Sequence, residues 1–168
     1  MTYRQAIERS NEHIAKLEPS FREKVAKWYK ELFDKKTPVL IYCSTRTPEE
    51  QEELYARGRT KPGAKVTNAR GTPPQSLHIH GKAIDAVPLA RSEAGGYFTA
   101  WDDEVTYGIM RKIAEKHGLR YLDWETPHFE DAGVSGWREL VSIPKKEIQK
   151  AVEKKTKSIA KKNPWASR

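Results

Sequence analysis

Two histidines and an aspartate stand close together in the segment SLHIHGKAID, residues 76–85. His78, His80 and Asp85 are of the types that bind Zn²⁺ in catalytic sites, where three protein ligands leave a fourth position for water. The same side chains could instead make ordinary hydrogen bonds at the surface, with no metal. Residue types alone therefore allow a metal site and do not establish one.

A second group of the same kind follows about 45 residues later in ETPHFE. His128 offers a further metal ligand. Glu125 could then be the nearby carboxylate that binds no metal and acts as general base, and Asp123 is the alternative base. Both segments are expected to contain strands, so one sheet could bring the two groups together.

Alternation along a strand does not decide which histidine would be a ligand. His78 and His80 would face the same side of an ideal strand, whereas Asp85 is an odd number of residues from both. Either pairing therefore requires a turn or bulge, which Gly81 could supply. From the residues themselves, either His78 or His80 could be the metal ligand.

Composition and charge describe one soluble domain with a basic end. The chain has 168 residues, of which 37% are hydrophobic and 32% charged, and it contains no apolar run long enough for a membrane helix. Its net charge is +8, and residues 144–168 alone carry nine Lys or Arg against two Glu. We therefore expect a domain over residues 1–143 and a basic helical tail over 144–168. Because the body is nearly neutral, no nucleic-acid partner is expected.

The single cysteine limits what sulfur chemistry is available. Cys43 excludes an internal disulfide and a multi-cysteine zinc site. It ends the apolar run VLIYC, where a buried thiol is the ordinary interpretation. A catalytic thiol would need a histidine base close in space.

Local patterns predict an α+β fold, with a small antiparallel sheet and flanking helices. A capping-box pattern starts at Ser20, another starts at Thr47, and Gly58 is suited to end the helix that follows Thr47.

In the helix after residue 101, Val105 and Ile109 are expected to face the core, together with Ile113 and Met110. The expected elements are helices over 3–17, 20–33, 48–57 and 101–117, strands over 39–43, 82–89, 119–121 and 124–130, and a long loop over 59–75.

The motif S-x-H-x-x-G-x-A-x-D over residues 76–85, followed by E-x-P-H-F over 125–129, resembles a family of zinc peptidases. These enzymes cleave bonds to D-amino acids in peptidoglycan, and they include D-Ala-D-Ala carboxypeptidases and the L-alanyl-D-glutamate endopeptidases of phage lysis. The segment STRTPEEQEELYARGRTKPGAKVTNA, residues 44–69, is similar to the endopeptidase branch in particular. The resemblance covers roughly residues 38–130 and implies a Hedgehog/D-Ala-D-Ala-peptidase-like fold.

The resemblance also implies a role for each matching residue. It makes His78, Asp85 and His128 the Zn²⁺ ligands and Glu125 the catalytic base. Arg46 would bind the substrate carbonyl. Ser76 would help to hold the substrate, and His80 would stand at the pocket wall or beside a ligand.

Two departures from the family pattern bear on the base. Many endopeptidase relatives have Asp where this chain has Glu125, and the stretch between Tyr121 and His128 is shorter than usual. A rearranged loop would make Asp123 the base instead.

The resulting expectation is a monomeric phage endolysin that cuts the L-Ala–D-Glu bond of the peptidoglycan stem peptide. The N-terminus lacks the apolar segment of a secretory signal, so we expect synthesis in the host cytoplasm and action on the cell wall in the periplasm. The alternatives are a D-Ala-D-Ala carboxypeptidase and a zinc-containing binding module without catalysis. The tail over 144–168 is either a solvated helix or a segment that binds anionic lipid or lipopolysaccharide.

Overall fold

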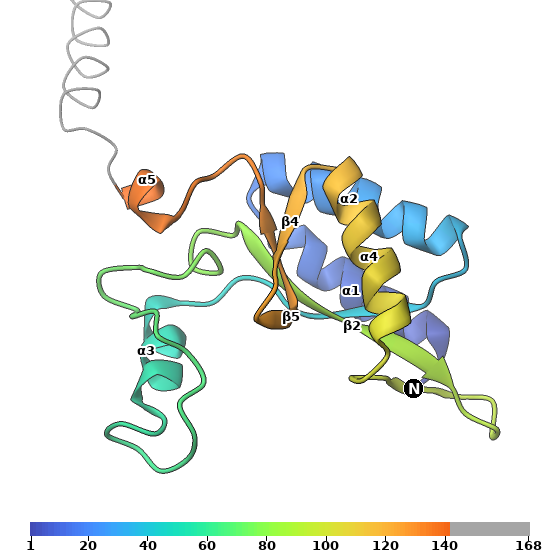
Figure 1. The fold of residues 1–168 in the computed structure, drawn as a ribbon, viewed down its shortest axis with the longest axis horizontal. Coiled ribbons are helices and arrows are strands. Elements are labelled where there is room, and N and C mark those ends of the chain that lie inside the picture. Colours follow the sequence, from blue (N-terminus) through green and yellow to red (C-terminus); the bar gives the residue numbers. More distant parts are fainter. Residues whose placement is uncertain (142–168) are drawn as a thin grey trace, which may run out of the picture.

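The computed structural model describes residues 1–141, and these form helices around a small antiparallel sheet (Figure 1). The predicted α+β class is confirmed. The elements are α1 (Tyr3–Ala15), α2 (Pro19–Asp34), β1 (Val39–Cys43), α3 (Pro48–Ala56), β2 (Ala83–Arg91), β3 (Tyr97–Thr99), α4 (Glu104–Lys116), β4 (Leu119–Leu122), β5 (Glu125–Asp131) and α5 (Trp137–Val141).

The order of the strands places the two histidine segments side by side. The sheet runs β1-β2-β5-β4, every pair is antiparallel, and the short strand β3 pairs with the last three residues of β2. In the register of β2 and β5, Asp85 lies directly opposite His128. On the other side of β2, Cys43 of β1 is the partner of Asp85.

Helices α2 and α4 pack behind the strand that carries His128. Trp28 of α2 is fully buried, and its indole N–H donates to the carbonyl of Met110 in α4 at 3.0 Å. The same indole ring lies 5.2 Å from the ring of Phe129, centroid to centroid. Aromatic contact at this spacing holds β5 from behind, whereas α3 and the loop after it extend away from this core (Figure 1).

Helix α1 completes the hydrogen bonding of the edge strand β1. The hydroxyl of buried Ser10 accepts from the backbone N–H of Ile41 at 3.0 Å and donates to the carbonyl of Ala6 at 2.8 Å. An edge strand otherwise leaves such an N–H unpaired. This hydroxyl therefore joins α1 to the sheet by a polar contact inside the core.

Replacing Ser10 with alanine should lower the free energy of unfolding by about 1–3 kcal/mol, because it leaves the Ile41 N–H buried without an acceptor. Urea unfolding of Ser10→Ala measures the loss. Asn11→Ala, at the next and exposed position of α1, is the matched control and should change stability by no more than about 0.5 kcal/mol. Equal stability of the Ser10 variant and the wild type would contradict this role.

Helix α2 begins earlier than its sequence pattern predicts. The expected Ser20 cap is wrong: the cap is Glu18, whose carboxylate accepts from the backbone N–H groups of Ser20 at 3.1 Å and Phe21 at 3.2 Å. Pro19 occupies the first helical position, where the missing N–H of proline costs nothing. At α3, by contrast, the predicted capping box of Thr47 is confirmed.

The predicted inner face of α4 is also wrong in part. Val105 is 78% exposed and Ile109 is 40% exposed, whereas Tyr107, Met110 and Ile113 are buried. At 3.6 residues per turn, Val105 and Ile109 each lie about 200° around the helix from Tyr107. The apolar residues of α4 therefore cover more than one face, and the packing partners choose between them.

The predicted basic tail and the domain boundary at residue 143 lie outside the described residues. Within residues 1–141, no helix combines the length and the apolar character that crossing a membrane would require.

Candidate metal and catalytic site

Three buried side chains converge at the junction of β2 and β5. His78 Nε2 lies 3.3 Å from His128 Nδ1 and 3.3 Å from Asp85 Oδ1, and His128 Nδ1 lies 3.2 Å from the same carboxylate oxygen. Ligands of a tetrahedral Zn²⁺ with Zn–N bonds of about 2.0–2.1 Å are themselves about 3.3–3.4 Å apart. The three atoms are therefore spaced as one metal ion would require.

The backbone explains how these side chains meet. Asp85 and His128 are paired across β2 and β5, but His78 lies on a tight turn before β2 rather than on a strand. Gly81 closes this turn with φ +64°, and a Cβ there would stand 2.8 Å from the backbone nitrogen of Glu18. The expected turn at Gly81 is confirmed, and it makes strand alternation irrelevant to His78.

The outer nitrogen of each imidazole is already occupied. His78 Nδ1 donates to the carbonyl of Ser44 at 2.5 Å, and His128 Nε2 lies 3.1 Å from Glu130 Oε2. Arg120 in turn donates to Glu130 at 2.6 Å. Such partners fix the tautomer and direct the remaining lone pair inward, as around metal-binding histidines generally.

Sequence reasoning missed Ser44 and Glu130 as partners of the histidines. Glu130 could have been found, because residues two apart on a strand share a face and His128 lies at that spacing. The contact between the Ser44 carbonyl and His78 joins two segments that are distant in the sequence, so no local pattern indicates it.

The charges of the cluster suit a cation. Burial raises the pKa of Asp85, but hydrogen bonds from His128 and His78 outweigh it and hold this pKa well below its ordinary value. Asp85 is therefore an anion. Burial lowers the pKa of His128, whereas Asp85 and Glu130 raise it, with the result at about 9. His128 must therefore release the proton on its inner nitrogen before that nitrogen can bind a cation.

Arg46 joins the cluster to the open space beside it. Its guanidinium donates to Asp85 Oδ2 at 2.9 Å and to Gln51 Oε1 at 3.2 Å. Gln51 is fully buried, and its amide donates to the carbonyl of Ala69 at 3.0 Å. Gln51, which the sequence did not single out, therefore orients Arg46.

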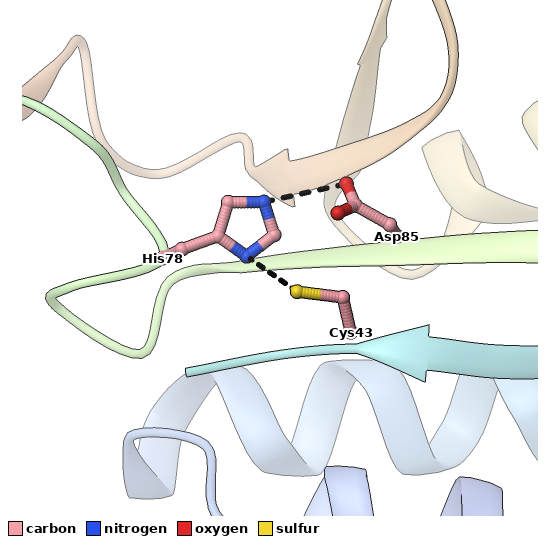
Figure 2. A group of neighbouring side chains, drawn as sticks. All are labelled: Cys43, His78 and Asp85. Carbon is pink, nitrogen blue, oxygen red and sulfur yellow. Dashed lines mark hydrogen bonds and ion pairs between the residues drawn. The ribbon is translucent and has the colours of Figure 1, made fainter. Parts of the chain in front are cut away.

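Cys43 offers a second possible ligand set with His78 and Asp85, in which one ligand atom from each lies within 4.8 Å of the others. Figure 2 shows that the thiol faces Nδ1 of His78, whereas Asp85 faces Nε2 on the other side of the ring. Nδ1, the nitrogen that faces the thiol, already donates to the Ser44 carbonyl, which disfavours this set. Burial and the charge of Asp85 also raise the pKa of the thiol, which disfavours the thiolate that metals and nucleophilic catalysis require.

A cavity of about 320 Å³ opens beside the three converging side chains. Of the residues that the sequence singled out, Arg46, Ser76, His78, Glu125 and His128 line it. The structure therefore gathers two of the three expected ligands, the expected base and two of the expected substrate-binding residues around one space.

Three further candidates are not among the residues that line this cavity: Asp85, which contacts both histidines, His80 and Asp123. His80 is half-buried, and its Nε2 lies 3.1 Å from the carbonyl of Pro74, so it contacts the loop before the turn. Asp123 is exposed in the turn between β4 and β5. A substrate contact of His80 stays a prediction, and the cavity favours Glu125 over Asp123 as the base.

One segment of the chain is similar in sequence to a curated peptidoglycan endopeptidase. Over 47 residues the chain is 51% identical to the peptidoglycan L-alanyl-D-glutamate endopeptidase CwlK of Bacillus subtilis (strain 168), which is 28% of this chain and 27% of that protein. The chain thus matches about a quarter of the length of this curated relative. No family model matches it.

Solved structures show the same architecture. The crystal structure of Serratia marcescens L-Ala D-Glu endopeptidase ChiX superimposes with a TM-score of 0.50 and 17% identity, over 73% of this chain and 85% of that chain. The LdcB LD-carboxypeptidase superimposes with a TM-score of 0.52 and 15% identity, over 69% of this chain and 59% of that chain. The chain has the D-Ala-D-Ala-peptidase-like fold. The resemblance first drawn from short motifs is thereby confirmed in the 47-residue match and in the fold.

Proposed function

We propose that the protein is a zinc-dependent peptidase of peptidoglycan stem peptides that cuts the L-Ala–D-Glu bond. The observation that carries the proposal is the convergence of His78 Nε2, Asp85 Oδ1 and His128 Nδ1 to within 3.3 Å of one another beside a cavity. The 47-residue similarity to CwlK and the resemblance of residues 44–69 to the endopeptidase branch support the choice of bond.

The donor set fits Zn²⁺. Two imidazole nitrogens and one carboxylate oxygen are a recognised catalytic combination, and three protein ligands leave a position open for water. His78, Asp85 and His128 would hold the ion, with Ser44 and Glu130 orienting the imidazoles. Zinc bound there would lower the pKa of a water from about 15.7 toward about 7 and polarise the scissile carbonyl.

The residues around the cavity supply the proton transfers and the binding. Glu125 accepts a proton as the water oxygen attacks the carbonyl carbon, and it passes that proton to the leaving amine nitrogen when the C–N bond breaks. Arg46 has N–H donors beyond those used by Asp85 and Gln51, and these stabilise the oxygen that gains negative charge. Ser76, which is buried at the cavity wall, helps to hold the substrate.

The biological setting belongs to the same proposal. A peptidase of this specificity suits a phage endolysin, which would act as a monomer on the cell wall in the periplasm once the membrane is opened. The basic residues 144–168 would add attraction to anionic lipid or lipopolysaccharide.

Mass spectrometry of purified Gram-negative peptidoglycan, digested with and without a chelator, tests the proposal. The expected products carry a new D-Glu amino terminus and disappear when the metal is removed. Release of terminal D-Ala alone would instead assign the enzyme to the carboxypeptidases. No cleavage by folded, zinc-loaded protein would favour a zinc-containing binding module.

A further inference from the structure

A second cavity, of about 590 Å³, adjoins the candidate catalytic cavity. Residues 65–69 form one part of its wall, and Trp124 and Glu125 form another. Thr67, Ala69, Trp124 and Glu125 also line the first cavity. The two spaces are therefore neighbouring parts of one cleft, with the proposed base at their shared wall.

Trp124 is the most exposed large hydrophobic side chain among residues 1–141, at 81%. It stands in the turn between β4 and β5, directly before Glu125. An indole left in water beside an active site is the kind of surface that a ligand covers. Trp124 thus offers a flat apolar face in the wall of the second cavity.

The facing loop presents the polar side chains of Thr67 and Asn68, and hydrogen bonds from Gln51 and Arg59 hold it in place. The Gln51 amide donates to Thr67 Oγ1 at 3.3 Å and to the Ala69 carbonyl at 3.0 Å. The Arg59 guanidinium donates to the Thr67 carbonyl at 3.0 Å and to Asn68 Oδ1 at 2.9 Å. The wall is therefore formed before any ligand arrives, and Lys65 adds a cation to it.

An aromatic face opposite hydroxyl, amide and ammonium groups matches the chemistry of an N-acetylated sugar, whose hydroxyl and carbonyl oxygens accept hydrogen bonds. The C–H face of a sugar ring stacks on an indole, while its hydroxyl and acetamide groups require polar partners. In peptidoglycan, the first stem residue, L-Ala, is joined to the lactyl group of the muramic acid. Cleavage after L-Ala places the sugar a single residue from the scissile bond, and one residue spans at most about 3.6 Å.

We propose that the second cavity binds the N-acetylmuramyl sugar of the substrate, with Trp124 as its stacking surface and residues 65–69 as its polar wall. This rests on the proposed L-Ala–D-Glu cleavage, because a carboxypeptidase cuts several residues away from the sugar. The sugar site makes the enzyme prefer stem peptides that are still attached to glycan.

The test compares a disaccharide tetrapeptide, GlcNAc-MurNAc-L-Ala-D-Glu-diaminopimelate-D-Ala, with the same tetrapeptide lacking sugar. The wild type should show the higher kcat/KM on the sugar-bearing substrate. Trp124→Ala should reduce that preference by roughly three- to tenfold, the size of one aromatic stacking contact, and Trp124→Phe should retain most of it. Trp101→Ala is the control, because Trp101 is a half-exposed tryptophan packed on Tyr42 outside both cavities, and it should leave the preference unchanged.

Equal losses on both substrates in Trp124→Ala would overturn the inference, since Trp124 would then only position Glu125. Equal wild-type rates on the two substrates would overturn it as well. Binding of both compounds to the Glu125→Gln variant, measured by calorimetry, separates this failure from failure of the proposed function. Sugar-dependent affinity that Trp124→Ala removes would support the sugar site even if the wild type cleaved neither compound.

Discussion

Glu125→Gln is expected to abolish nearly all hydrolysis of stem peptides while zinc stays bound. The amide keeps the size of the side chain, but it cannot accept the proton of the attacking water or return it to the leaving amine. Loss of a general acid–base group typically costs about 10²–10⁴-fold in rate. Glu125 lines the cavity and is not among the converging ligand atoms, so the metal content should not change.

Single-turnover rates on purified stem peptide, together with metal analysis by mass spectrometry, measure this effect. Asp123→Asn is the matched control, because it makes the same chemical change two residues earlier in an exposed turn. It should retain near wild-type activity. An active Glu125→Gln enzyme, or an inactive Asp123→Asn enzyme, would transfer the role of base to Asp123.

His78→Ala should lose zinc and all activity that depends on zinc, whereas His80→Ala should keep both. Of the two histidines, His78 contacts Asp85 and His128, whereas His80 contacts the carbonyl of Pro74. Loss of a partner outside the ligand set already costs about 10–100-fold in metal affinity. Removal of the ligand itself should therefore cost at least about 100-fold.

Competition with a chromophoric chelator gives the zinc affinity of each variant, and thermal unfolding gives an independent measure. Zinc at about 100 times its Kd stabilises the folded state by about 2.7 kcal/mol. This zinc-dependent rise in Tm should be present in His80→Ala and absent in His78→Ala. The reverse pattern would assign the ligand role to His80, and zinc binding that survives His128→Ala but not Cys43→Ala would favour the set of Cys43, His78 and Asp85.

Much of this arrangement follows from local sequence. Apolar runs and helix-start signals predicted most of the strands and helices, because they act within a few residues. The capping box at Thr47 and the turn at Gly81 are of this kind. The converging residues His78, Asp85 and His128, and Arg46, Ser76 and Glu125 beside them, were named from the family resemblance, whereas Ser44, Gln51 and Glu130 were not.

Other features were decided only by contacts between distant segments. The pairing of β2 with β5 sets Asp85 opposite His128, and the carbonyl of Ser44 selects which nitrogen of His78 points inward. The buried face of α4 was likewise set by Trp28 and its neighbours rather than by the periodicity of α4 itself. Each segment of the sequence supplies its own side chains, but the positions of these side chains relative to one another depend on strand register and on packing across the whole domain. That is the physical reason why strand alternation left both histidines open and only the family resemblance chose His78, whereas the structure brings the His78 ring next to Asp85 and His128.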